Sequence, residues 1–298
     1  MAFKLLVRHP DKGFVGALEP LLEDTAYILC VPPDTIDWQD SDSIIKSFSS
    51  SPPKIVVYLL PEDLKAIDDN FLREQQALVE VCSSKNIPFV QISSYRVFGD
   101  VWVERGWRES DEPDPTDALG KVILQLEKNA SQVKRHIILR AGWLLEGQGG
   151  LLESIILPML DNESLVVSDR RYGSPLSQKY IARAVLAMAQ QIIFGADNWG
   201  VFHLHSSDRC SEAEIADHLQ RLLANEFKLN PTQPSVTLPG DDRYLLPGCA
   251  HLLGRRCTAN FGIQLPTWRT GFARTVKSWL DEVTQGQDET TKQQKGPG

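Results

Sequence analysis

PFVQISSYRVFGD (88–100), followed by DPTDALGKVILQLEK (114–128), decides how this chain folds. The first stretch opens with an apolar run, 89–92, which predicts a buried strand that ends at Ser94 and leads into an aromatic loop. The second stretch has apolar residues at helical spacing and predicts an amphipathic helix. A strand, a loop and a returning helix in this order are typical of a parallel α/β sheet.

The same segment has the layout of a short-chain dehydrogenase active site, but two of its chemical groups are replaced. In those enzymes the helix carries Tyr-x-x-x-Lys on one face. The phenol donates a proton because the neighbouring ammonium lowers its pKa. Leu119 and Ile123 occupy these two positions here, and neither can donate a proton. Ser94 is the only surviving member of the catalytic set. It could hydrogen-bond a substrate carbonyl, or it could simply cap the strand end.

Four further stretches give the chain a family resemblance. They are HIILRAGWLLEGQGG (136–150), GSPLSQKYIARAVLAM (173–188), GVFHLHSSDRCSEAEIADHL (200–219) and FGIQLPTWRTGFARTVKSWL (261–280). Together they resemble, in order, the dTDP-4-dehydrorhamnose reductase (RmlD-like) family of extended short-chain dehydrogenases, which reduce a nucleotide-linked keto sugar with NAD(P)H. The regulatory β-subunit of methionine adenosyltransferase belongs to the same family, so the resemblance implies the fold more strongly than the activity.

The order of elements predicts two domains and a tail. Residues 1–165 alternate strand-like and helix-like stretches, as a Rossmann-like doubly wound parallel sheet does. The resemblance implies that 166–284 form a smaller C-terminal domain for a sugar nucleotide, including a helix that returns to the body. Residues 285–298 are polar and rich in Gln and Gly, and we expect a disordered tail there.

The N-terminus carries an altered dinucleotide-binding turn. A dinucleotide fold has a glycine-rich turn between its first strand and first helix, where backbone N–H groups meet the pyrophosphate. The resemblance aligns the family's three glycines with Pro10, Gly13 and Gly16. Proline at the first position fixes φ and removes an N–H donor. Two cationic side chains, Arg8 and Lys12, could still hold an anion in a reshaped loop. The alternative is a structural turn that binds nothing.

Two other places affect cofactor binding. Asp34, after the strand predicted at 26–31, is nearest to where an acidic residue would hold a ribose 2′-hydroxyl. Residues 58–60, Tyr-Leu-Leu, align with a family segment of small residues and would fill part of the groove, unless they pack in the core. NADP or NAD is therefore a possible cofactor, but these replacements disfavour ordinary nicotinamide binding.

Five side chains are candidates for substrate binding: Tyr95, Arg96, Arg140, Trp143 and Arg255. Tyr95 and Arg96 directly follow Ser94. Arg140 and Trp143 match the family's Arg-Thr-x-Trp strand end; alternatively they form a salt bridge and part of the interdomain core. Arg255 lies where the family has a polar sugar-binding stretch, and it could contact a diphosphate.

Composition narrows the class of protein. The chain has 298 residues, 42% hydrophobic and 23% charged, with a net charge of −8. It has no Lys/Arg-rich block to contact nucleic-acid phosphates. No apolar run approaches the ~18–20 residues that span a bilayer, so we expect a cytoplasmic protein. His203 and His205 share a face of a predicted strand, but no acidic or cysteine partner stands at a supporting spacing, and we expect no metal site.

Three functions fit these patterns. The first is a catalytically degenerate family member that binds a nucleotide, a nucleotide sugar or a protein partner. The second is an active NAD(P)H-dependent reductase of a dTDP-4-keto sugar, with its proton supplied by water or another donor. The third is an interaction scaffold without a ligand.

Overall fold

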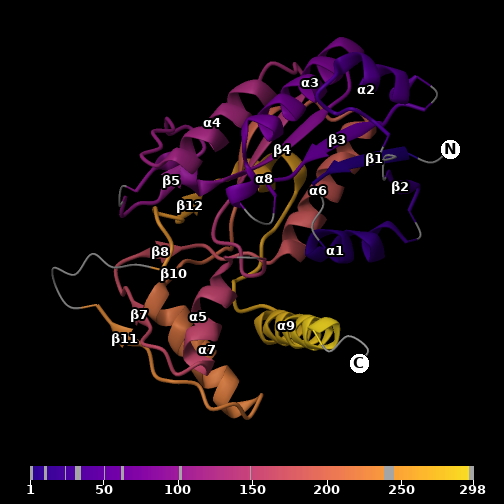
Figure 1. Ribbon diagram of the computed structural model, residues 1–298. Coiled ribbons are helices and arrows are strands. Elements are labelled where there is room, and N and C mark those ends of the chain that lie inside the picture. Colours follow the sequence, from indigo (N-terminus) through magenta and orange to yellow (C-terminus); the bar gives the residue numbers. More distant parts are fainter. Residues whose placement is uncertain are drawn as a thin grey trace.

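A six-stranded parallel sheet organises the larger part of the molecule (Figure 1). The computed structural model describes residues 3–9, 12–23, 25–30, 35–49, 51–61, 64–100, 103–147, 149–237 and 245–294. From one edge, the strands are β2 (Tyr27–Cys30), β1 (Phe3–Arg8), β3 (Ile55–Tyr58), β4 (Phe89–Ser94), β6 (His136–Ala141) and β9 (Gly200–Leu204). All four residues of β3 are buried, as expected of a central parallel strand that is covered on both faces.

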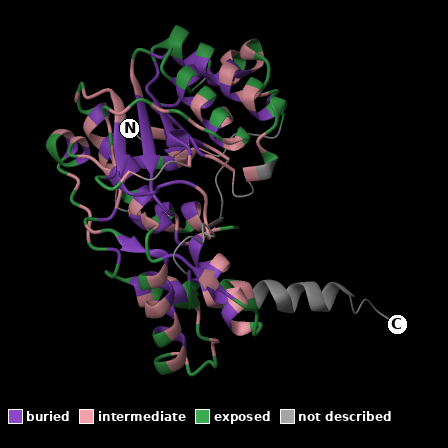
Figure 2. Ribbon diagram, turned by 90° about the vertical axis from the view of Figure 1, so that its left-hand side faces the viewer, coloured by how far each residue is buried: buried purple, intermediate pink, exposed green. Residues whose placement is uncertain are grey.

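Helices cover both faces of this sheet. On one face, α1 (Lys12–Leu22) packs against α6 (Gln178–Ile193). The other face carries α2 (Ser41–Phe48), α3 (Asp69–Lys85) and α4 (Ala118–Ala130). Figure 2 shows the strands as buried and the outer turns of the helices as exposed. The predicted α/β, Rossmann-like doubly wound fold is confirmed.

A smaller part lies beyond one end of the sheet (Figure 1). Its helices are α5 (Leu151–Leu160), α7 (Glu212–Asn225) and α9 (Phe272–Gln294), whereas the short helix α8 (Arg256–Phe261) packs against β9 and α6 of the larger part. Two-stranded ribbons join β5 (Trp107–Arg108) to β12 (Leu252–Leu253), β7 (Val166–Val167) to β11 (Ser235–Val236), and β8 (Tyr172–Gly173) to β10 (Cys210–Ser211). Two short 3₁₀ helices, η1 (Leu64–Ala66) and η2 (Tyr95–Phe98), follow β3 and β4.

The two parts are interleaved along the chain, because elements from both sides of residue 165 contribute to each part. Strand β9, from the C-terminal half, completes the large sheet, and α6, from the same half, packs on one of its faces. Helix α5, which precedes residue 165, packs with α7 in the small part. The reason is that the chain crosses between the two parts more than once, so burial, not sequence order, decides where each element belongs. Helix α9 ends at Gln294.

Candidate functional site

A cleft opens at the carboxyl ends of β3, β4 and β6, the edge where open α/β sheets bind ligands. It encloses a cavity of about 170 Å³. Residues from both parts of the molecule line it, among them Phe14, Leu60, Ser94, Trp143, Glu146 and Leu246. Such a volume is smaller than the ~300–1,000 Å³ of pockets that enclose whole drug-sized ligands, so the cavity can enclose only part of a nucleotide-sized molecule.

The turn after β4 brings three of the predicted site residues to this cleft. Ser94 ends β4, and its hydroxyl accepts a hydrogen bond from the Arg96 backbone N–H at 3.3 Å. Arg96 reaches back to α4, where its guanidinium lies 3.2 Å from the carboxylate of Asp117. Tyr95 also lines the cleft but is 6% exposed. Burial raises the pKa of its phenol, against the opposing charge of Arg96, which makes Tyr95 a poor proton donor.

Helix α4 presents apolar side chains where the resemblance places the catalytic pair. Ile123 is fully buried in the hydrophobic cluster between the two parts, and Leu119 packs against that cluster. A Cβ atom at Gly120 would lie 2.6 Å from the carbonyl oxygen of Arg96, so glycine lets the helix approach the η2 turn closely. The scaffold of the active site is therefore kept, while its proton donor and the cation that would activate it are absent at these positions.

Arg140 is held behind the cleft in a buried ion pair. Its Nε and Nη2 donate to the two carboxylate oxygens of Glu127 at 2.9 and 2.7 Å, and both side chains are 4% exposed. The hydroxyl of Ser93 donates to the same carboxylate at 2.5 Å. Because both Glu127 oxygens are engaged with the guanidinium, Arg140 ties β6 to α4. This is the salt-bridge alternative that the sequence left open, and Arg140 is not among the residues that line the cleft.

Trp143 lies between the cleft and the small part. It is 1% exposed and is one of the residues that line the cleft. A Cβ atom at Gly173 would lie 2.2 Å from its ring, so the glycine of the Gly-Ser-Pro segment is needed for the tryptophan to pack there. The indole therefore belongs both to the core between the two parts and to the wall of the cleft, and its contact with a substrate stays a prediction.

At the cofactor end, the predicted cation is already neutralised. The Arg8 guanidinium donates to Glu74 at 2.7 and 2.9 Å, His9 lies 2.9 Å from the same carboxylate oxygen, and Trp38 stacks on Arg8 at 4.0 Å. Burial alone would raise the pKa of Glu74, but the hydrogen bond and charge of His9, together with Arg8, lower it below its ordinary value. The carboxylate therefore stays charged and competes with any phosphate for Arg8.

The remaining cofactor positions give a mixed result. Gly13 and Gly16 lie in α1, and a Cβ built on Gly16 would meet no atom within 4 Å apart from its chain neighbours and the helix's own backbone. Pro10 and Asp34 lie outside the described residues, as does the side chain of Lys12.

Of residues 58–60, only the last two affect the groove. Tyr58 turns into the core under α3, where its hydroxyl donates to the carbonyl of Phe71 at 3.1 Å. Leu59 and Leu60 line the cleft. Both alternatives for this segment therefore hold in part.

Several residues of the cleft are absent from the sequence prediction. Glu146 accepts a hydrogen bond from the Gln178 backbone N–H at 3.0 Å, and both residues line the cavity. Leu246 comes from a distant segment and carries no local pattern that could have identified it.

The backbone around Leu246 is anchored at two points. Glu212 accepts from the N–H of Leu245 at 2.9 Å, and Asp100 accepts from the N–H of Gly248 at 3.1 Å. Glu212 also accepts from Ser168 at 2.9 Å, and burial raises the pKa of its carboxyl. These contacts hold the small part's loop over the cleft.

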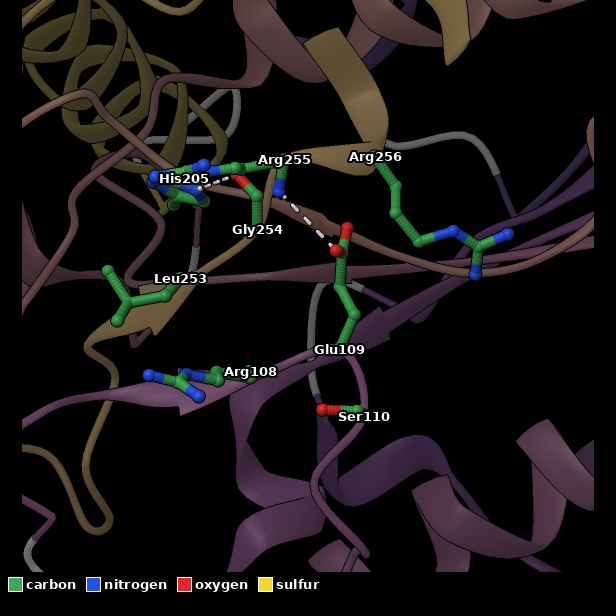
Figure 3. Close-up of a pocket in the computed structure, with 8 residues that line it drawn as sticks. All are labelled: Arg108, Glu109, Ser110, His205, Leu253, Gly254, Arg255 and Arg256. Carbon is green, nitrogen blue, oxygen red and sulfur yellow. Dashed lines mark hydrogen bonds between the residues drawn. The ribbon is translucent and has the colours of Figure 1, made fainter. Parts of the chain in front are cut away.

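Arg255 does not reach the cleft. It precedes α8 and lines a separate cavity with Arg108, Glu109 and His205 (Figure 3). The predicted substrate residues therefore fall in three places: the cleft for Tyr95, Arg96 and Trp143, the buried ion pair for Arg140, and the second cavity for Arg255. Within the described residues there is no cluster of His, Cys, Asp and Glu side chains that could hold a metal ion. No described helix is both long and apolar enough to cross a membrane.

This chain matches one protein-family model in sequence and several solved structures in fold. A model of the family described as "RmlD substrate binding domain" matches residues 65–280. No curated protein matches the chain in sequence.

Solved structures of similar fold include sugar-nucleotide enzymes. A dTDP-4-dehydrorhamnose reductase from Clostridium acetobutylicum has a TM-score of 0.71 and 20% identity, with 95% of this chain and 100% of that chain covered. One from Bacillus anthracis, in complex with NADP, has a TM-score of 0.70, 14% identity and coverage of 95% and 100%. The Bordetella bronchiseptica enzyme WbmG, in complex with NAD, has a TM-score of 0.72, 14% identity and 95% coverage of both chains. At these identities the likeness shows the fold alone.

Proposed function

Because the chain belongs to the RmlD substrate-binding domain family, we propose that it binds a nucleotide or a nucleotide sugar in the cleft and does not transfer hydride. The observation that carries this proposal is the apolar face of α4, where Ile123 is fully buried and Leu119 packs beside it. Loss of general-acid catalysis of this kind lowers the rate of the chemical step by ~10²- to 10⁴-fold. A role as a regulatory subunit that presents the bound ligand to a protein partner is compatible with the same site.

The cofactor implied by the family fits the described residues poorly. NADP and NAD are bound by the similar Bacillus and Bordetella enzymes. In this chain, however, Arg8 is paired with Glu74 and Trp38, and Leu59 and Leu60 narrow the groove. A nucleotide sugar that inserts one ring beside Ser94 needs less of the groove than a dinucleotide does. The polar groups around that position, Ser94, Arg96 and Glu146, suit a hydroxylated ring.

A thermal-shift titration tests the proposal. The panel is dTDP-, UDP- and GDP-sugars, with NADP⁺, NADPH, NAD⁺ and NADH as the alternative ligands. A ligand at a hundred times its dissociation constant adds ~2.7 kcal/mol to the free energy of unfolding. With an unfolding entropy of ~2.1 cal/mol/K per residue over 298 residues, this raises the Tm by about 4 °C.

A matched pair of variants locates the site. Leu246→Trp adds bulk inside the cleft and should abolish the shift. Leu229→Trp makes the same change at a residue that is 38% exposed, away from the cleft, and should leave the shift intact. A sugar-nucleotide-dependent oxidation of NADPH that is lost in Ser94→Ala would contradict the proposal and support the active reductase. Silence across the whole panel would leave the scaffold without a ligand.

A further inference from the structure

A second cavity lies apart from the cleft, between the ribbon of β5 and β12 and the turn that leads into α8 (Figure 3). Its volume is about 620 Å³, within the ~300–1,000 Å³ of small-molecule sites. Two stretches, 108–110 and 253–256, line it together with His205, and it shares no lining residue with the cleft. The resemblance implied only that Arg255 could contact a diphosphate of a sugar nucleotide, and the proposed function, which places its ligand in the cleft, does not account for a cavity at this place.

The frame of this cavity is fixed by hydrogen bonds. Glu109 accepts from the backbone N–H groups of His203 and Arg255 at 3.1 and 3.4 Å, so its carboxylate secures the turn before α8. His205 Nε2 lies 3.3 Å from the carbonyl oxygen of Gly254. A Cβ atom at Gly254 would lie 2.8 Å from the Glu109 carboxylate, so glycine is needed for this close approach.

Arg256 anchors the other side of the turn. Its guanidinium donates to the carbonyl oxygen of Trp199 at 2.8 Å and lies 4.4 Å above the ring of Phe202. In Figure 3 the Arg256 side chain points away from His205. Arg256 therefore has a structural role and is not available to a ligand.

Two other guanidinium groups of the cavity are available. Arg108 and Arg255 are both exposed, and neither forms an ion pair with a carboxylate in the part of the chain that the structure describes. Asp111, close to Arg108 in sequence, is engaged by Arg105 at 2.7 and 3.0 Å. The Glu109 carboxylate accepts a hydrogen bond from the backbone N–H of Arg255 and not from its guanidinium. The cavity thus carries two guanidinium groups that have no ion-pair partner among the described residues, beside one carboxylate, Glu109, whose oxygens accept from backbone N–H groups.

We propose that this cavity binds a small molecule that carries a phosphate group, with Arg108 and Arg255 as the phosphate ligands. Guanidinium groups donate paired N–H groups in a fixed fork that matches phosphate oxygens. Ser110 adds a hydroxyl donor and Leu253 an apolar wall for the rest of the ligand. A long polyanion such as nucleic acid would be repelled by the acidic chain, so the ligand is small. The proposal is independent of any ligand in the cleft.

Calorimetric titration with inorganic pyrophosphate, at low ionic strength, tests this site. The site variant carries Arg108→Gln and Arg255→Gln. The control variant carries Arg73→Gln and Arg274→Gln, which remove the same two charges from exposed positions on α3 and α9. We expect saturable binding of one pyrophosphate to the unchanged protein, a loss of at least about tenfold in affinity in the site variant, and less than about twofold in the control. Equal losses in both variants, or no saturable binding to the unchanged protein, would overturn the proposal.

Two further measurements separate this site from the cleft. Leu246→Trp should leave pyrophosphate binding unchanged; if that variant loses it while the site variant keeps it, the anion binds in the cleft and the second site is refuted. Arginine modification by phenylglyoxal, mapped by mass spectrometry on the unchanged protein, should show protection of Arg108 and Arg255 by pyrophosphate. Protection of Arg96 in their place would again assign the anion to the cleft.

Discussion

Removing one partner of the Glu127–Arg140 ion pair should destabilise the fold strongly without changing the ligand site. Arg140→Met leaves the Glu127 carboxylate, 4% exposed, with the Ser93 hydroxyl as its remaining hydrogen-bond partner among the described residues. Breaking a buried pair in this way costs ~3–5 kcal/mol. For 298 residues and an unfolding entropy of ~2.1 cal/mol/K per residue, the Tm should fall by about 5–8 °C.

The double variant Glu127→Met with Arg140→Met sharpens this prediction. Replacing both charges by apolar side chains of similar volume is often close to neutral, so the double variant should recover most of the lost stability. The two single changes should therefore be strongly coupled, which a double-mutant cycle by urea unfolding measures directly.

An exposed pair provides the control. Asp217 and Arg221 form an ion pair one turn apart on α7, with side chains 42% and 65% exposed. Asp217→Asn should change the free energy of unfolding by no more than ~0.5 kcal/mol. If Arg140→Met proves as mild as this control, or if it abolishes ligand binding while the Tm holds, the structural role of Arg140 is refuted and the predicted substrate contact is restored.

Other consequences follow from single positions. Burial, reinforced by the charge of Arg140, lowers the pKa of His203 from 6.5 to about 3. Below pH 6.5 the imidazole is protonated in the unfolded chain but stays neutral in the folded chain. The free energy of unfolding should therefore fall by up to ~1.4 kcal/mol per pH unit on acidification. Urea unfolding from about pH 7 to about pH 4 should show a shallower decline for His203→Asn, and an equal decline would contradict this assignment. Gly173→Ala should lower the free energy of unfolding by ~1–3 kcal/mol through its clash with Trp143. Gly16→Ala should raise it by ~0.5–1 kcal/mol, because the new Cβ in α1 would meet no atom within 4 Å apart from its chain neighbours and the helix's own backbone. Calorimetry that ranks the two variants the other way would show that packing at Gly173 is relaxed.

The helices and strands could be predicted from the sequence because each is determined by a local pattern of residues. The apolar run 89–92 forms β4, the helical spacing after residue 117 forms α4, and Ser211 and Glu214 form the capping box that begins α7. Each pattern records which side chains of one short segment must be buried. The order of these segments was also sufficient to indicate the family.

The candidate site could be predicted from the sequence only in part. Ser94, Tyr95 and Arg96 are consecutive, so the position of one strand end places all three at the cleft. The sequence could not show that Arg8 is neutralised by Glu74, because the two lie on different elements.

The sequence by itself therefore determined the α/β fold, the family and the loss of the tyrosine and lysine, since these depend on residue types and local periodicity. Only the tertiary structure decided that Arg140 is buried against Glu127, that Leu246 lines the cleft, and that Arg108 and Arg255 line the same second cavity. Each of these facts depends on segments far apart in the chain being packed side by side. Local patterning records whether a residue is buried or exposed, but the partner it meets is set by how the whole chain packs.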